Sequence, residues 1–427
     1  MVGGALRDRL LGNDHRDADY ATDALPDVVE EIAAALDSRT VTIGRRFGTI
    51  ALQLGEAWVE ITTFRGDSYK PGVRWPDVTF GTSIEEDLAR RDFTCNALAQ
   101  NMVTGEQLDP FHGASDIEGQ ILRAVGDPAA RFREDPLRIL RGFRFSSQLG
   151  FEIEAETLAA MGEASDLLAQ LSHERVTGEL DGLLLGSEPS RGLRALAGTG
   201  SLAVVLPELG AAQGCEQNRF HRFDVWEHTV ATVEAIVVGS ESARIRRWSA
   251  LVHDIGKPAV RHRKPNGEWG FYRHETVGSK MVADLMERLH FARREAQVIE
   301  LLVRRHMDRP QVDERSSVRR FMHRARGAWR DLHALKVADN ASHTYSDREY
   351  HESLRKACET IEKEEAEALR AESPLSGDDL IEIFGQSPGP WIGEMKRRLS
   401  AMVLDGDLAP GDRAAAEQVV RDLISRR

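Results

Sequence analysis

The sequence predicts an α+β protein in which a mixed α/β N-terminal region precedes an all-helical remainder. Three observations lead to this class. Short β-branched runs occupy only the stretch from residue 1 to about 112, whereas long amphipathic patterns dominate from about 113 onward. Segments rich in Gly, Pro and Ser separate the helical patterns, at 186–190, 205–210, 373–377 and 386–390.

The N-terminal region contains three runs that alternate as strands do. They are Thr40–Ile43, Thr49–Leu54 and Ala57–Phe64, and Asp27–Leu36 has the spacing of a helix.

Helical periodicity then continues through three long segments. They are Asp135–Leu149, Ala155–Leu171 and Glu174–Leu185. Pro136 fits a first helical turn, which predicts Asp135 as the N-cap of the first of them.

Composition excludes several classes of protein. The 427 residues carry 56 Lys+Arg against 69 Asp+Glu, a net charge of −13, which argues against a protein that coats nucleic acid by bulk charge. The sequence has no run of about 18 apolar residues, so it predicts no membrane span. Its charged start does not resemble a signal peptide. Three widely spaced cysteines fit a reducing compartment, so we expect a cytoplasmic protein.

Charge is unevenly distributed along the chain. Residues 151–190 hold nine acidic and one basic residue, whereas 261–330 hold seventeen basic and nine acidic residues. Such blocks are either solvated helix faces or, for the basic one, the contact surface of an anionic partner.

The first chemical signal lies near the N-terminus. Gly3 and Gly4 let the backbone approach a ligand closely, and Arg7 suits a triphosphate. Asp17 and Asp19 are two residues apart, so on a strand both carboxylates face one side and favour Mg²⁺. Turn glycines and capping aspartates are the alternative interpretation.

A third carboxylate is available on a neighbouring strand. Trp58, Glu60 and Thr62 share one face of the run at 58–62. Glu60 is therefore either a catalytic partner of the aspartate pair or an exposed strand residue.

A ridge of arginines lies on the predicted helix after Asp135. Arg138, Arg141 and Arg144 are three residues apart. Such a ridge is commonly solvated or ion-paired, but this one continues from a carboxylate.

These motifs, taken in order, resemble those of the class II tRNA nucleotidyltransferases (CCA-adding enzymes), a family shared with bacterial poly(A) polymerases. The segments are VGGALRD with DAD, EEDLARRDFTCNALA, DPFHGASDI and REDPLRILRGFRF, between residue 2 and about 150. The resemblance implies a polymerase-β-like nucleotidyltransferase head of mixed sheet and helices, followed by an all-α neck, HD domain and tail.

The resemblance also implies site roles, which we carry over residue by residue. It implies that Gly4 and Arg7 contact the triphosphate and that Asp17 and Asp19 bind catalytic Mg²⁺. It implies that Arg91 and Asp92 contact the phosphate and ribose, and that Asp135 and Arg138 contact the base edge. Arg141 and Arg144 would complete the nucleotide pocket. The chemistry agrees, because a carboxylate accepts from the exocyclic amine that cytosine and adenine share. In the family a strand and a helix precede the Gly-Gly turn. Either the natural start lies upstream of residue 1, which we favour, or the head is destabilised at its nucleotide-binding edge.

A second constellation has the pattern H…HD…D. His228, His253, Asp254 and Asp339 lie in order on apolar helical patterns and resemble the metal site of an HD phosphohydrolase domain, which suits a divalent transition metal. Lys257 could hold a phosphate. His274 and His306 are candidates for a second metal or for substrate contact, or are surface histidines.

The sequence thus predicts a head at 1–112, a helical neck and RNA-binding region at 113–205, an HD domain at 206–350 and a helical tail at 351–427. The predicted reaction is addition of C and A from CTP and ATP to the 3′ end of tRNA, with release of pyrophosphate. An A-adding enzyme, a poly(A) polymerase and an enzyme that is mainly an HD-type phosphohydrolase remain alternatives. A protein-modifying uridylyltransferase and an RNA-binding scaffold are less consistent with the motifs.

Overall fold

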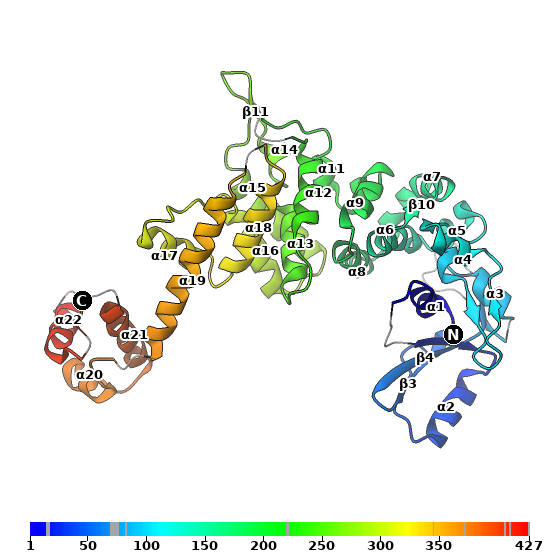
Figure 1. The fold of residues 1–427 in the computed structure, drawn as a ribbon, viewed down its shortest axis with the longest axis horizontal. Helices are drawn as coiled ribbons and strands as arrows, with labels where there is room; N and C mark the ends of the chain where they lie inside the picture. Colours follow the sequence, from blue (N-terminus) through cyan, green and yellow to red (C-terminus); the bar gives the residue numbers. More distant parts are fainter. Residues whose placement is uncertain are drawn as a thin grey trace. The chain divides into compact units, whose positions relative to one another are not determined.

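The computed structural model describes residues 1–13, 18–68, 77–81, 83–218, 222–344, 346–370, 373–404, 407–409 and 411–425 (Figure 1). The chain divides into two compact units. The first comprises Met1–His306 with Ala338–Ser346, and the second comprises Met307–Val337 with Asp347–Arg427. No helix in the described ranges is long and apolar enough to cross a bilayer.

A four-stranded sheet organises the N-terminal part of the first unit. Its spatial order is β1 (Ala18–Thr22), β4 (Ala57–Thr63), β3 (Thr49–Leu54) and β2 (Thr40–Val41). β1 runs parallel to β4, and the other pairs are antiparallel. The strands predicted at 49–54 and 57–64 are confirmed. The strand predicted at 40–43 is shorter than expected and ends at Val41. The chain leaves the sheet there and turns into the short 3₁₀ helix η1 (Arg45–Phe47).

Helix α2 (Pro26–Ala35) covers this sheet. Val29 and Ala33 pack against Ile50 and Leu52 of β3. Pro26 occupies the first turn, where its missing N–H needs no partner. The helix predicted at 27–36 is therefore confirmed to within one residue.

The N-terminal turn brings α1 (Gly3–Leu10) against the end of β1. The Val2 N–H donates to the Asp19 carbonyl at 3.0 Å, and Val2 also forms an antiparallel bridge with Ala99. Gly3 has a positive φ of 66°, and a Cβ there would lie 2.6 Å from Arg91 Nη1. The positive φ favours glycine at this position, where α1 begins beside both β1 and the Arg91 side chain.

Shorter elements complete the head and lead into the neck. They are β5 (Arg65–Ser68), β6 (Asp77–Phe80), α3 (Ile84–Ala89), η2 (Thr94–Asn96), β7 (Ala99–Gln100), β8 (Gln107–Leu108), α4 (Gly113–Glu118), β9 (Ile121–Leu122) and β10 (Glu152–Ile153). β9 and β10 pair beyond residue 113, where the sequence predicted helices alone.

The neck is helical, as predicted. Its elements are α5 (Pro128–Glu134), α6 (Leu137–Leu149), α7 (Ala155–Glu163), η3 (Ser165–Gln170), α8 (His173–Leu184), α9 (Pro189–Gly198), α10 (Ser201–Val205) and α11 (Pro207–Gly210). The single helix predicted at 155–171 breaks at Ala164, where the backbone leaves the α region (φ −97°, ψ 4°). Asp135 caps α6 as predicted: its backbone is extended and its Oδ1 accepts from the Leu137 N–H at 3.1 Å, while Pro136 after it already has helical angles.

The remainder of the first unit is a helical cluster with one hairpin. It contains α12 (Val225–Ala235), α13 (Ala243–Val252), α14 (Lys257–Val260), β11 (His262–Arg263), β12 (Trp269–Gly270), α15 (His274–Arg288), α16 (Arg293–Arg305) and the C-terminal turn of α18 (Trp329–Ala341). A Cβ on Gly256 would lie 2.3 Å from the His274 carbonyl oxygen. This glycine therefore permits the close contact that brings the chain after Asp254 against the start of α15.

The second unit contains α17 (Arg315–Arg324), α19 (Arg348–Arg370), α20 (Gly377–Phe384), α21 (Pro390–Leu404) and α22 (Arg413–Ser425). The last three helices enclose their own core, formed by Leu375, Leu380, Leu399, Leu408, Ala416 and Val420. Basic residues of α17 pair with acidic residues of α19: Arg315 with Glu364, and Arg319 with Glu365 at 3.4 Å. Part of the basic block is thus neutralised within its own unit.

Candidate active site in the head and a histidine cluster

A cavity of about 550 Å³ opens in the head between the sheet, α1 and α6. Ten of the eleven residues predicted to be catalytic or to bind the nucleotide line it: Gly4, Arg7, Asp19, Glu60, Arg91, Asp92, Asp135, Arg138, Arg141 and Arg144. The eleventh, Asp17, lies outside the described residues. One cavity therefore collects residues from four separate sequence motifs.

Two carboxylates stand side by side on the floor of this cavity. Asp19 on β1 and Glu60 on β4 are direct partners in the parallel register, and both line the cavity. Side chains paired in this way project to the same face of a sheet. The arrangement offers oxygen ligands of the kind that a hard divalent cation prefers.

Arg7 is fixed before any ligand arrives. Its Nε and Nη2 donate to the two Asp8 oxygens at 2.7 and 2.8 Å, and its Nη1 donates to Asn96 Oδ1 at 2.7 Å. The side chain is buried, and a bidentate pair of this kind holds the guanidinium plane in one orientation.

Asp92, which is buried, and Arg141, which is partly exposed, form an ion pair in the cavity wall. Arg141 Nε donates to Asp92 Oδ2 at 2.6 Å, while Asn96 Nδ2 and the Phe93 N–H donate to Oδ1 at 3.1 and 2.8 Å. Burial alone would raise the pKa of Asp92, but the charge of Arg141 and these hydrogen bonds lower it to about 2. Asp92 is thus an anion that orients Arg141 at neutral pH.

Asp87 orients two further arginines, a role that the sequence did not reveal. Its carboxylate is fully buried and accepts from Arg90 Nη2 at 2.7 Å and Arg91 Nη2 at 3.0 Å. The spacing of three and four residues on one helical turn was the available signal.

Arg138 and Asp135 are held from different sides. Arg138 Nη1 donates to Glu134 Oε2 at 2.9 Å, and its Nη2 donates to the Arg90 carbonyl at 2.8 Å. Asp135 Oδ2 accepts from Arg175 Nη2 at 3.2 Å, and Asp135 Oδ1 accepts from the Leu137 N–H. Both groups are therefore positioned as a rigid pair at the cavity edge.

Helix α8 supplies two supporting residues that sequence reasoning missed. Arg175 contacts Asp135, and Glu179 accepts from Arg144 Nε at 2.6 Å. They are four residues apart and so share a face of α8, but the sequence did not indicate that this face packs on α6. Phe145 was also missed, although the guanidinium groups of Arg144, Arg141 and Arg7 lie 4.3, 5.1 and 5.4 Å from its ring centroid.

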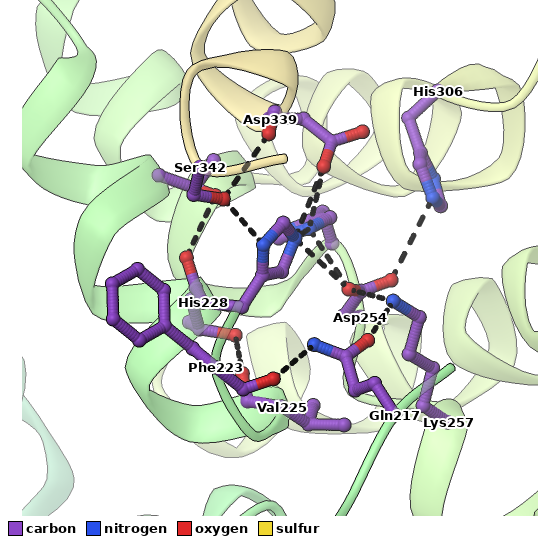
Figure 2. A network of polar contacts seen from close by, with 12 residues as sticks. Gln217, Phe223, Val225, His228, Asp254, Lys257, His306, Asp339 and Ser342 are labelled. Atoms are coloured by element: carbon purple, nitrogen blue, oxygen red, sulfur yellow. Dashed lines mark hydrogen bonds and ion pairs between the residues drawn. The ribbon is translucent and has the colours of Figure 1, made fainter. Parts of the chain in front are cut away.

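The second constellation forms a buried cluster in the helical part of the first unit. The predicted quartet, His228, His253, Asp254 and Asp339, comes together there. Figure 2 shows three of its members, His228, Asp254 and Asp339. His228 Nε2 lies 3.1 Å from His253 Nε2, 3.4 Å from Asp254 Oδ2 and 3.0 Å from Asp339 Oδ1. Nitrogen and carboxylate oxygen donors at these separations suit a divalent metal.

His274 and His306 belong to the same cluster, so the surface-histidine alternative is wrong for both. Their Nε2 atoms are 3.2 Å apart, and both side chains are buried. Burial, together with the nearby His274 and His253, lowers the pKa of His306 to about 3, so its imidazole is neutral at physiological pH.

Neighbouring side chains orient the cluster. Lys257 Nζ lies 2.6 Å from Asp254 Oδ2 and donates to Gln217 Oε1 at 2.6 Å. Ser342 Oγ is 2.5 Å from His228 Nδ1, and His343 Nε2 is 3.4 Å from Asp339 Oδ1. Ser342 and His343 were missed, although they follow Asp339 by only three and four residues, in the turn that ends α18.

Parts of the chain match three known family models. Residues 1–123 match the Poly A polymerase head domain, residues 150–213 match the probable RNA and SrmB-binding site of polymerase A, and residues 225–343 match the HD domain.

Whole-chain relatives agree with these matches. The chain is 32% identical to the A-adding tRNA nucleotidyltransferase of Deinococcus radiodurans, over 97% of this chain and 94% of that protein. It is 33% identical to the CCA-adding enzyme of Bacillus velezensis, over 96% and 90%. Among solved structures, the CCA-adding enzyme of Bacillus stearothermophilus in complex with CTP aligns with a TM-score of 0.68 at 27% identity, covering 100% of this chain and 94% of that one. The chain therefore belongs to the family of tRNA nucleotidyltransferases that includes the CCA-adding and A-adding enzymes.

Proposed function

We propose that this protein extends the 3′ end of tRNA with C and A, taken from CTP and ATP, to build the CCA end. The observation that carries the proposal is the head cavity, which gathers paired carboxylates, an arginine ridge and the Asp135–Arg138 pair around one space. Relatives that add CCA or A, and a related structure holding CTP, support the same reaction.

The floor of the cavity would hold Mg²⁺. Asp19, with Asp17 as its expected partner and Glu60 beside it, supplies the oxygen ligands. The bound cation would lower the pKa of the attacking 3′-hydroxyl and stabilise negative charge on the departing pyrophosphate. The residues themselves orient the triphosphate: Arg7 and Arg91 are each fixed by an aspartate, so they meet the phosphates without further ordering.

Base choice would rest on Asp135 and Arg138. The carboxylate accepts from the exocyclic amine of cytosine or adenine, and the arginine donates to the adjacent ring acceptor. Uracil and guanine present a carbonyl where the amine would be, which a carboxylate repels. Since Arg175, Glu134 and the Arg90 carbonyl hold this pair in place, protein groups can act as the template.

A nucleotide-addition assay tests the proposal. tRNAs ending before CCA, after C and after CC would be incubated with CTP alone, ATP alone and both. We expect two C additions followed by one A. Addition of A to the CC-ended tRNA only would support the A-adding alternative and reject CCA synthesis, whereas long A tracts would indicate a poly(A) polymerase.

A second activity is proposed for the histidine cluster, which would hold a divalent transition metal and hydrolyse phosphate esters. The His/Asp donor set and the adjacent Lys257 carry this proposal. Hydrolysis of 2′,3′-cyclic and 2′-phosphorylated RNA ends by the intact chain would be compared with that by His253→Ala. Equal rates in the two proteins would exclude the cluster as the active centre.

The domain assignment follows the same proposal. The head would span 1–112, the neck and RNA-binding region 113–205, the HD domain 206–350 and the tail 351–427, in a cytoplasmic enzyme. Limited proteolysis followed by mass spectrometry would locate the boundaries.

A further inference from the structure

We propose that residues 261–273, here called the basic arm, bind an unpaired RNA strand and lead its end to the histidine cluster. The arm contains the hairpin of β11 and β12 and joins α14 to α15. Figure 1 shows the hairpin projecting beyond these two helices. What happens to the strand's end rests on the proposed phosphoesterase activity, whereas the binding of the strand does not.

The basic arm combines cations with aromatic rings. It holds four Lys or Arg residues, one acidic residue and three aromatic residues. Within the described part of the chain, no carboxylate pairs with Arg263, Lys264 or Arg273, and all three side chains are exposed. Cations that the protein does not neutralise are available to phosphate oxygens.

Trp269 orients Arg263 without neutralising it. The two residues are direct partners in the antiparallel register, and the guanidinium carbon of Arg263 lies 3.8 Å from the centroid of the indole ring. Arg261 lies over the same ring at 3.6 Å, but its Nη2 donates to Glu216 Oε2 at 3.2 Å. The same Glu216 oxygen accepts from the indole Nε1 at 3.0 Å. Arg261 is thus neutralised, whereas Arg263 keeps its charge and a guanidinium plane on which a base can stack.

The hairpin tip is closed by its own hydrogen bonds. The Lys264 N–H donates to the Glu268 carbonyl, and the Gly267 N–H donates to the Lys264 carbonyl, both at 2.9 Å. Gly267 has a φ of 80°, which glycine adopts readily, and its carbonyl accepts from Arg263 Nη1. Asn266 Oδ1 accepts from the Glu268 N–H at 3.2 Å. Because the tip holds Arg263 in one arrangement, little conformational entropy is lost when a strand binds.

The basic arm adjoins the histidine cluster at both of its ends. Lys257, just before it, lies 2.6 Å from Asp254 Oδ2, and His274, just after it, lies 3.3 Å from Asp254 Oδ1. The Phe271 carbonyl lies 2.9 Å from His274 Nδ1, and the Phe271 ring centroid lies 5.6 Å from Lys257 Nζ. Tyr272 is 79% exposed and lies two residues before His274, which is at most about 7 Å along the backbone. A nucleotide stacked on Tyr272 would therefore lie beside the cluster.

An unpaired RNA strand fits this surface better than other anions do. Proteins bind single strands with exposed aromatic rings that stack on bases and with cations that follow the backbone. Tyr272 supplies the ring, and Arg263 and Arg273 supply the charge. A duplex hides the faces of its bases, so it would gain nothing from Tyr272. An acidic peptide would match the charges but would offer no planar group to the ring.

RNA binding to the full chain tests the inference. An unpaired eight-nucleotide RNA with a 3′-phosphate and a 5′-fluorophore is titrated with the protein in the presence of a chelator, which prevents both extension and hydrolysis. Affinity is measured by fluorescence anisotropy. We expect Tyr272→Ala to weaken binding about tenfold, because a base loses its stacking partner. We expect Arg263→Gln to weaken it about fivefold, because one phosphate contact is lost. Both side chains are exposed, so neither change should disturb folding.

Arg355→Gln serves as the matched control. It removes the same charge from another partly exposed arginine, but Arg355 is already neutralised by Glu352 and Glu359. The control should bind the RNA as tightly as the unchanged chain. All three variants should add nucleotides to saturating tRNA at the unchanged rate, which separates this inference from the reaction in the head.

The path of the strand is tested by cross-linking. An RNA with 4-thiouridine as its last nucleotide should cross-link to peptides covering 253–274, and the cross-link should be lost in Tyr272→Ala. Absence of cross-links to these peptides, equal affinity of Tyr272→Ala and the unchanged chain, or equal binding of a duplex of the same length would overturn the proposal. Displacement of the RNA by an equal concentration of polyglutamate would overturn it in favour of an acidic peptide.

Discussion

The Asp92–Arg141 ion pair leads to a prediction whose size follows from the structure. Asp92 is 6% exposed, and its pKa is lowered from 3.8 to about 2. At about 1.4 kcal/mol for each pKa unit, the surroundings stabilise the carboxylate by about 2 kcal/mol. The side chain of Arg141 is one-third exposed and can be rehydrated, so Asp92→Asn should cost less than the roughly 3–5 kcal/mol typical of a broken, fully buried pair.

A double-mutant cycle isolates the pair. Asp92→Asn, Arg141→Gln and the double variant would be compared by hydrogen exchange of peptides covering residues 90–98 and 137–149, a local readout suited to a chain of several domains. We expect a coupling of about 1–2 kcal/mol. Because the folded pKa is depressed, this stability is fully present above about pH 4 and is lost as the pH falls toward 2. Single effects that add to within about 0.5 kcal/mol would refute the reasoning.

Three further predictions concern the head. Asp19→Asn removes a charge from a predicted Mg²⁺ ligand, so nucleotide addition, measured with labelled ATP and CTP, should fall at least about a hundredfold. The phosphoesterase activity of the histidine cluster should be unchanged. Retained nucleotide addition would contradict the assigned site. Gly113→Ala would place a Cβ 2.1 Å from the Thr94 carbonyl oxygen, so it should destabilise the head by about 1–3 kcal/mol in hydrogen exchange; unaltered protection would show that the backbone accommodates it. Glu179→Ala removes the ion pair of Arg144 but leaves its hydrogen bond to Gln148 and its contact with the Phe145 ring, so kcat/KM for addition should fall by up to about tenfold. We expect partial recovery in Glu179→Gln, and equal rates in wild type and Glu179→Ala would show that the ion pair does not position Arg144.

The head cavity could be predicted well because its residues lie in short motifs. Period-two alternation placed Glu60 on one face of its strand, and the parallel register of β1 and β4 places Asp19 beside it. The predicted pairing of Asp19 with Asp17 lies outside the described residues. The arginine ridge follows from helical spacing alone, and all three of its members line the cavity. Local periodicity is sufficient where a functional group depends on one strand or one helix.

The residues that support the site were less predictable, because their partners come from distant parts of the chain. Arg175 and Glu179 meet Asp135 and Arg144 only when α8 packs on α6. The break at Ala164 gave no composition signal. Such features depend on tertiary packing, which one sequence does not encode at a fixed spacing.

The ion pairs between α17 and α19 have a consequence for how RNA binding should depend on salt. Each phosphate neutralised by a free Lys or Arg releases counterions, and the slope of log affinity against log salt concentration counts such contacts. Arg315 and Arg319 are already matched by Glu364 and Glu365, so they have little net charge to offer a phosphate. The slope for tRNA should therefore be shallower than the seventeen basic residues between 261 and 330 suggest, and replacing the two glutamates by glutamine should steepen it.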